Sequence, residues 1–216
     1  MLVTDLETTG LKPEIHSIIS IGAIQFENPS NTFYMECRPY DGAVIDPVAL
    51  NVNGATWLND PLKPSLEEAL RAFLSWTYGI SGNKELAGSN IGFDISFLKD
   101  TARRYNITCD FGHHPVDVGD WFVMSLCLRE LPVPEKFRTD TILEYVGLQK
   151  EPVPHIGIVG AKMEAEAFLR LLGRGLLKEY ESFPIPEYLQ NMKKATDLLR
   201  TLENRVIQTR SLSVSK

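Results

Sequence analysis

The stretch Val3-Thr4-Asp5-Leu6-Glu7-Thr8-Thr9-Gly10 places two carboxylates two residues apart near the start of the chain. An apolar run leads into it and a Thr-Thr-Gly turn ends it, so we expect a strand followed by a sharp turn. Residues i and i+2 of a strand project from the same face. Asp5 and Glu7 therefore share one face, where they repel each other unless a cation lies between them. A solvated strand end is the alternative interpretation of such a pair.

The composition predicts one globular domain and disfavours a protein that holds duplex nucleic acid through a basic surface. The 216 residues are 44% hydrophobic and 23% charged, with a formal net charge of −6. The three cysteines, Cys37, Cys109 and Cys127, lack metal-binding spacing, which favours buried thiols in a reducing compartment. No run is long and apolar enough to span a membrane, and a cleavable signal peptide would remove Asp5, so we expect a cytoplasmic protein.

Apolar patterns along the chain predict an α/β domain. We expect strands over residues 2–5, 17–26, 32–37, 85–88 and 115–118. Capping residues and apolar spacing predict helices that begin near residues 47, 66, 94, 120, 139 and 161. Three antiparallel strands followed by helices that alternate with short strands indicate a mixed sheet flanked by helices.

A further acidic residue lies in Asn90-Ile91-Gly92-Phe93-Asp94, between a predicted strand and a predicted helix. One interpretation makes Asp94 an ordinary helix cap. Phe93, however, is apolar where a cap region is usually polar, so we expect this backbone to lie against the core. That placement favours a functional role for Asp94.

The two acidic stretches together resemble motifs of a known enzyme family. D-x-E-T-T-G followed by N-x-x-F-D is similar to the first two motifs of the DEDD 3′–5′ exonucleases, which have the ribonuclease H-like fold. The resemblance implies a three-layer α/β domain, a mixed five-stranded sheet flanked by helices, over residues 1–175. It also implies that Asp5, Glu7 and Asp94 bind Mg²⁺ or Mn²⁺. The implied contacts with the terminal nucleotide are Thr8, Leu11, Asn90 and Phe93.

The third motif of the family is altered in this chain. In the histidine branch (DEDDh) it reads H-x-A-x-x-D at the start of the last core helix, and the corresponding stretch here is His155-Ile156-Gly157-Ile158-Val159-Gly160. The resemblance implies that His155 is the general base, with an exposed loop histidine as the alternative. Gly157 in place of alanine is a mild change, whereas Gly160 removes the fourth carboxylate.

The glycine at position 160 leaves two alternatives for function. The family's reaction uses two divalent cations, and loss of a carboxylate is expected to weaken one of them. The chain is either a metal-dependent 3′–5′ exonuclease of DNA or RNA that releases nucleoside 5′-monophosphates, or an impaired relative that binds nucleic-acid 3′ ends or a protein partner. Glu164 is either a first-turn residue favoured by the helix dipole or a replacement ligand. Glu166 is expected to be exposed, in an ion-pair ladder with Lys162 and Arg170.

The remaining expectations concern histidines, the C-terminal segment and partners. His16, His113 and His114 are expected at the surface. Residues 176–216 are predicted to form a helical extension laid on the core, with a dimerising helix as the alternative. The expected partner is a single-stranded nucleic-acid 3′ end, and the choice between DNA and RNA stays open, as does association with a polymerase.

Overall fold

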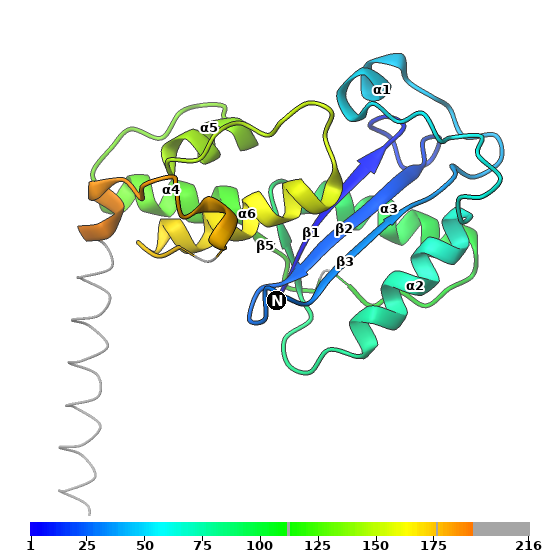
Figure 1. Ribbon diagram of the computed structural model, residues 1–216, viewed down its shortest axis with the longest axis horizontal. Helices are drawn as coiled ribbons and strands as arrows, with labels where there is room; N and C mark the ends of the chain where they lie inside the picture. The colour runs from blue at the N-terminus through cyan, green and yellow to red at the C-terminus, as the bar shows by residue number, and fades with distance from the viewer. Residues whose placement is uncertain (112, 176, 192–216) are drawn as a thin grey trace, which may run out of the picture.

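One mixed sheet forms the middle layer of a three-layer α/β arrangement (Figure 1). The computed structural model describes residues 1–111, 113–175 and 177–191. Five strands follow the order β3-β2-β1-β4-β5: β1 (Leu2–Thr8), β2 (Ile18–Gln25), β3 (Thr32–Glu36), β4 (Leu86–Gly88) and β5 (Val116–Asp117). β1 pairs antiparallel with β2 and parallel with β4, so the predicted mixed sheet is confirmed.

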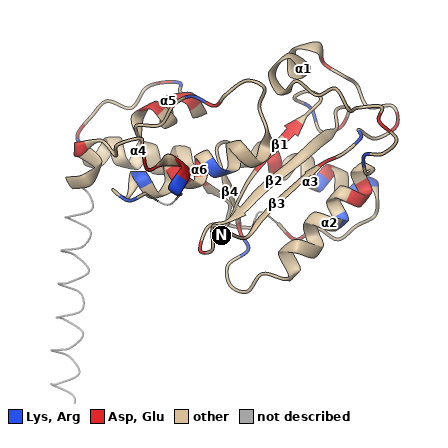
Figure 2. Ribbon diagram, in the orientation of Figure 1, with Lys and Arg blue, Asp and Glu red and all other residues tan. Residues whose placement is uncertain are grey.

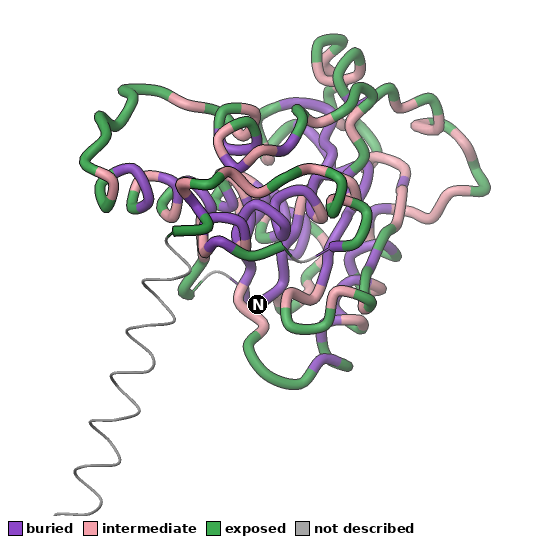
Figure 3. The backbone as a smooth tube through the Cα atoms, turned by 60° about the vertical axis from the view of Figure 1, so that its left-hand side comes forward, coloured by how far each residue is buried: buried purple, intermediate pink, exposed green. Residues whose placement is uncertain are grey.

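Helices cover both faces of the sheet. One face carries α2 (Leu66–Tyr78) and α3 (Ile91–Arg104), and the other carries α6 (Gly157–Leu171), with α4 (Val118–Leu128) and α5 (Thr139–Tyr145) beside it. The short helix α1 (Pro47–Asn53) precedes α2, and a 3₁₀ turn, η1 (Lys178–Tyr180), follows α6. Buried residues concentrate between these layers (Figure 3). Among the residues that the structure describes, no helix is long and apolar enough to cross a membrane.

β1 divides its side chains between the two helical layers because successive residues point to opposite faces. Leu2 and Leu6 belong to the core cluster under α2 and α3, whereas Val3 belongs to the cluster under α6. Asp5 and Glu7 are two and four residues after Val3, so their side chains point to the same face, the α6 side of the sheet. The strand is longer than predicted, and both carboxylates lie in its second half.

The predicted caps of α1 and α2 are present. The Asp46 side chain accepts a hydrogen bond from the Val48 backbone N–H at the start of α1. Ser65 and Glu68 form a reciprocal capping box at the start of α2. Both helices therefore begin where the sequence predicted, because the capping residues satisfy backbone donors that would otherwise lack partners.

Two helix starts differ from the predictions. The N-cap of α3 is Asn90, with φ of 53°, so the interpretation of Asp94 as the cap is wrong. α6 begins at Gly157, four residues before the predicted start, which places Gly160 in its first turn.

Glycines allow the first turn of α6 to contact the sheet. A β-carbon on Gly22 of β2 would lie 2.1 Å from the Gly157 carbonyl carbon, and one on Gly157 would lie 2.7 Å from the Asp5 carbonyl oxygen. A side chain at either position would push the helix away from β1. The glycine at position 157 is therefore part of the contact that brings α6 close to Asp5.

The prediction that Glu166 is exposed is wrong. Glu166 and Arg170 are each 1% exposed, and Arg170 Nε lies 2.7 Å from Glu166 Oε1. The guanidinium also donates to the carbonyl oxygens of Tyr180 and Phe183, at 2.9 and 2.8 Å. This buried ion pair ties the chain that follows α6 to the helix.

The segment after residue 175 packs on the core as far as the structure describes it. Leu189 is fully buried, and the Tyr188 hydroxyl donates to the Tyr145 carbonyl oxygen. Residues 192–216, which carry most of the predicted C-terminal helix, lie outside the described residues, so neither its packing on the core nor the dimerising alternative is tested. The domain boundary at residue 175 stays a prediction.

Candidate active site

The two acidic residues of the first motif lie in the second half of β1, where the ribbon carries the colour of Asp and Glu (Figure 2). Asp5 is half-buried and Glu7 is 9% exposed. The Asn53 side-chain amide, at the end of α1, donates to the Thr8 carbonyl oxygen at 3.0 Å. This bond ties the end of the strand to α1, so the acidic pair has a fixed position relative to that helix.

Asp94 reaches the first motif from α3. Its Oδ1 accepts a hydrogen bond from the Leu6 backbone N–H at 2.9 Å, and the residue is 4% exposed. The charges of Asp5 and Glu7 both act on it. A contact between residues 88 positions apart in the sequence, Leu6 and Asp94, thus brings Asp94 to the pair formed by Asp5 and Glu7.

His155 lies in the loop before α6, and α1 holds this loop. The His155 backbone N–H donates to the Val52 carbonyl oxygen at 3.0 Å. Its Nδ1 lies 3.5 Å from Glu151 Oε2, and ligand atoms of Glu7, Glu151 and His155 all lie within 4.8 Å of one another. Partial burial lowers the pKa of His155, which favours a neutral ring near pH 7.

The four predicted nucleotide contacts differ in how far they are exposed. Leu11 is 76% exposed in the turn after β1, and Asn90 is exposed at the start of α3. Phe93 is half-buried, with its ring centroid 4.8 Å from that of Phe97. The Thr8 hydroxyl donates to the Gly10 carbonyl oxygen at 2.7 Å. Leu11 and Asn90 are therefore accessible to a ligand, whereas the Thr8 hydroxyl shapes the turn.

Two further carboxylates face the site. Glu151 lies in the loop before α6, and the charges of Asp5 and Glu7 act on it. Glu164 is 5% exposed, and the charges of Asp5 and Asp94 act on it. Because α6 begins at Gly157, Glu164 lies beyond the first turn, and the interpretation as a first-turn residue is wrong.

Burial is the main cause of raised pKa values throughout this cluster. It raises the pKa of Asp5 to about 7, that of Glu7 to about 8 and that of Glu151 to about 9. Burial and then the charge of Asp5 raise the pKa of Asp94 and that of Glu164 well above their usual ranges. In the described part of the chain, the only ion pair formed by any of the five is that of Glu151 with His155. The cluster therefore lacks a resident positive charge from lysine or arginine there.

The donor set fits a hard divalent cation. Carboxylate oxygens are the ligands that Mg²⁺ and Mn²⁺ prefer. Glu151 Oε1 and Glu164 Oε2 are buried and have no hydrogen-bond partner among the described residues. A bound cation would neutralise the mutual repulsion and lower the raised pKa values. The placement of Asp5, Glu7 and Asp94 is thus compatible with the predicted metal site.

The metal-free protein is expected to lose stability as the pH rises from 5.5 to 8.5. The folded state binds protons at Asp5, Glu7 and Glu151 more tightly than the unfolded chain, so their stabilising contribution is lost between about pH 4.5 and pH 9. Thermal unfolding in EDTA should show a midpoint several degrees lower at pH 8.5. Excess Mn²⁺ should remove most of this difference. A midpoint that rises over this pH range in EDTA would contradict the assignment.

Sequence reasoning missed Glu151 and the role of Asn53. Glu151 lies in the loop Glu151-Pro152-Val153-Pro154-His155, where no periodicity indicates direction. Its position four residues before a candidate histidine was the one available signal. Asn53 could be recognised only as part of the Asn53-Gly54 helix stop, because its contact with Thr8 spans 45 residues.

His16 is not a surface residue as predicted, since it is only 9% exposed. Its ring covers Gly10, where a β-carbon would lie 2.2 Å from His16 Cδ2. The glycine of the first motif therefore makes room for this ring. Among the cysteines, Cys37 is buried as expected, but Cys127 is exposed.

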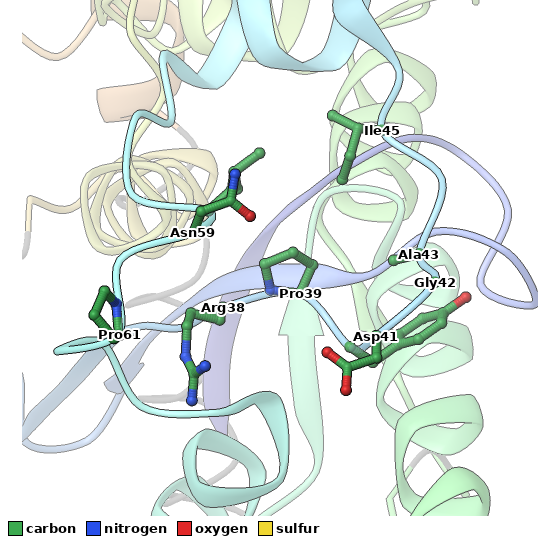
Figure 4. Close-up of a pocket in the computed structure, with 10 residues that line it drawn as sticks. Arg38, Pro39, Asp41, Gly42, Ala43, Ile45, Asn59 and Pro61 are labelled. Carbon is green, nitrogen blue, oxygen red and sulfur yellow. The ribbon is translucent and has the colours of Figure 1, made fainter.

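Two pockets lie near the segments that hold the site. One of about 330 Å³ lies between residues 38–45 and 58–61 (Figure 4), and none of the predicted site residues line it. Another, of about 610 Å³, is lined by Asn90 together with Asp117, Phe137 and Arg138. The second pocket therefore includes Asn90, one of the predicted nucleotide contacts, and offers an aromatic ring and a guanidinium.

Comparisons with known proteins agree with this geometry. A family model described as Exonuclease (RNase_T) matches residues 2–168. The chain is 28% identical over 177 residues to the PolC-type DNA polymerase III of Caldanaerobacter subterraneus subsp. tengcongensis, which covers 79% of this chain but 11% of that protein. It is 24% identical over 177 residues to the DNA polymerase III subunit epsilon of Aquifex aeolicus, covering 79% of each chain.

A solved structure shows the same fold. It is the nuclease domain of 3'hExo, a DEDDh family member bound to rAMP, with a TM-score of 0.62 at 18% identity, covering 86% of this chain and 95% of that one. The sheet order and the helices on both faces match the ribonuclease H-like fold that the motifs implied. The chain therefore belongs to the exonuclease family, whose model matches most of its length.

Proposed function

We propose that this chain is a divalent-metal-dependent 3′–5′ exonuclease that hydrolyses the terminal phosphodiester of single-stranded DNA or RNA and releases nucleoside 5′-monophosphates. One observation carries the proposal. Asp5, Glu7 and Asp94 converge on one place beside His155, and the cluster has no lysine or arginine partner within the described residues. Clustered carboxylates of this kind bind cations that in turn bind phosphate.

His155 fits the role of general base. Its ring is half-buried with a lowered pKa, and the loop that carries it is hydrogen-bonded to α1. Nδ1 faces the Glu151 carboxylate, so a proton on Nδ1 leaves Nε2 to accept a proton from the attacking water. Asp5, Glu7 and Asp94 would hold the cations. Divalent cations, when bound, lower the pKa of a water molecule and stabilise the charge on the leaving oxygen.

The substrate class follows from the surroundings of the cluster. Leu11, four residues after Glu7, and Asn90, four residues before Asp94, are exposed. The pocket that includes Asn90 also presents Phe137 and Arg138. Aromatic rings stack on unpaired bases, and guanidinium groups bind phosphate, so a single strand fits this surface better than a duplex. The net charge of −6 also disfavours extended contacts with duplex phosphates. The proposal includes both DNA and RNA as substrates. The relatives named DNA polymerase III suggest a polymerase as a partner.

The test uses 5′-labelled single-stranded DNA and RNA of one sequence, with Mg²⁺ or Mn²⁺. We expect a ladder of products shortened from the 3′ end, release of mononucleotides and complete inhibition by EDTA. A 3′-phosphorylated copy of the same oligonucleotide controls for the polarity of the reaction, because an endonuclease would cut both equally.

The alternative function is binding of a 3′ end or of a protein without cleavage, and the observation that favours it is Gly160. Retained binding of the oligonucleotide with no shortening in either metal would support this alternative and overturn the proposed activity. Glu151 and Glu164 argue against it, because a site that had lost its function would not be expected to keep five carboxylates together against their repulsion.

A further inference from the structure

The space beside Gly160 is already filled by carboxylates. A β-carbon on Gly160 would lie 2.1 Å from Asp5 Oδ2 and 3.0 Å from Glu151 Oε1. A side chain at position 160 would therefore project into the space that the carboxylates of Asp5 and Glu151 already occupy. The carboxylate that the family motif places at this position is missing, but a carboxylate from the preceding loop lies in the same place.

The two oxygens of Glu151 have different surroundings. Oε2 lies 3.5 Å from His155 Nδ1, whereas Oε1 is buried and has no hydrogen-bond partner in the described ranges. The side chain is 12% exposed, so water alone does not solvate it. Leaving a buried carboxylate oxygen without a donor or a cation is costly. Oε1 is therefore placed to ligate a cation that Asp5 and Glu7 also contact.

The loop that carries Glu151 is firmly attached. The His155 backbone N–H is bonded to α1, and a β-carbon on Gly54 would lie 2.8 Å from Pro154 Cβ, so the loop lies directly against the end of that helix. Two prolines, Pro152 and Pro154, restrict the backbone between Glu151 and His155. Such a loop can hold a ligand in place without help from a helix or a strand.

Glu164 gives independent support for a cation in this cluster. It is 5% exposed, its Oε2 has no hydrogen-bond partner among the residues described, and it faces Asp5 and Asp94. Its Oε2 lies near β4, 3.0 Å from the position of a β-carbon on Gly88. Glu164 thus approaches from the Asp94 side, whereas Glu151 approaches from the side of Glu7 and His155.

We propose that Glu151 is a metal ligand and supplies the carboxylate that Gly160 lacks. The inference rests on the proposed function, since it assigns a residue to the metal site of that reaction. It predicts that the site is complete in carboxylates rather than impaired. Glu164 is then a neighbour of the site on the Asp94 side and not the replacement ligand.

The test measures Mn²⁺ binding by titration calorimetry and by electron paramagnetic resonance, with and without thymidine 5′-monophosphate. Glu151→Gln keeps the size of the side chain and removes its charge, and is expected to weaken Mn²⁺ binding by at least about 10-fold. Glu164→Gln is expected to change it far less. Glu144→Gln is the matched control, because Glu144 is exposed in α5 and pairs with Lys150 outside the site.

The same measurement separates a metal ligand from a residue that only orients His155. An orienting residue would lower the catalytic rate in Glu151→Gln but leave Mn²⁺ affinity unchanged. Unchanged affinity in Glu151→Gln therefore overturns the proposal, as does a loss confined to Glu164→Gln, or no Mn²⁺ binding by the unaltered protein in either condition.

Failure of this inference can be told apart from failure of the proposed function. Metal-dependent shortening of oligonucleotides by the unaltered protein, together with normal Mn²⁺ binding by Glu151→Gln, would remove Glu151 from the site and leave the exonuclease. Mn²⁺ binding that depends on Glu151, in a protein that shortens no oligonucleotide, would support the ligand and overturn the activity.

Discussion

The Asp5→Asn variant is expected to shorten single-stranded oligonucleotides at least about 10³-fold more slowly than the unaltered chain. A metal ligand contributes several kcal/mol to stabilising transition-state charge, and each 1.36 kcal/mol is about tenfold in rate. Asp5 is central because its charge raises the pKa of each of the other four carboxyl groups, those of Glu7, Asp94, Glu151 and Glu164. Single-turnover rates with saturating Mn²⁺ measure the effect on the chemical step.

The same variant is expected to be more stable than the unaltered chain when no metal is present. Asparagine has nearly the shape of aspartate but no charge, so it relieves the repulsion that raises neighbouring pKa values. In EDTA at pH 8.5 its unfolding midpoint should be higher, with a smaller difference at pH 5.5. Asp41→Asn, in the exposed loop after β3, is the control and should change neither property. A variant that keeps more than about a tenth of the rate would show that Asp5 is not a ligand.

The fold was predictable because its signals are local. A short apolar run specifies β1, an isoleucine-rich run specifies β2 and apolar alternation specifies β3. Capping residues specify the starts of α1 and α2. The first two motifs were also predictable from sequence, since the acidic residues of D-x-E-T-T-G and N-x-x-F-D lie within short contiguous stretches. Their meeting is then a consequence of topology, because parallel pairing of β1 with β4 places α3 beside the end of β1.

The features that escaped prediction depend on contacts between distant segments. Gly160 indicates a missing ligand, but only the fold shows that Glu151 occupies the space beside it. Helix periodicity placed Glu166 in an exposed ladder, because the spacing of Lys162, Glu166 and Arg170 is that of a solvated face. The chain after α6 covers that face and supplies carbonyl oxygens for Arg170, which no pattern within the helix reveals.

Arg170→Met is expected to lower the free energy of unfolding by about 3–5 kcal/mol, which is the usual cost of breaking a buried ion pair by removing one partner. Methionine leaves the Glu166 carboxylate buried without its guanidinium, although the Leu177 backbone N–H still donates to Oε2 at 2.9 Å. It also removes the donors to the Tyr180 and Phe183 carbonyl oxygens. Urea unfolding followed by circular dichroism at pH 7 measures the loss.

Two comparisons show whether the loss comes from the uncompensated charge. Lys162 lies on α6 like Arg170 and forms a surface ion pair with Glu179 of η1. Lys162→Met breaks this pair and should cost no more than about 1 kcal/mol. The double variant Glu166→Leu, Arg170→Met removes both charges and should be more stable than Arg170→Met alone, because an apolar pair is cheaper to bury than a carboxylate that has lost its guanidinium. If Arg170→Met costs less than about 1 kcal/mol, or if the double variant is the less stable, the ion pair does not fasten the chain after α6. The contacts of Leu189 and Tyr188 would then carry that attachment.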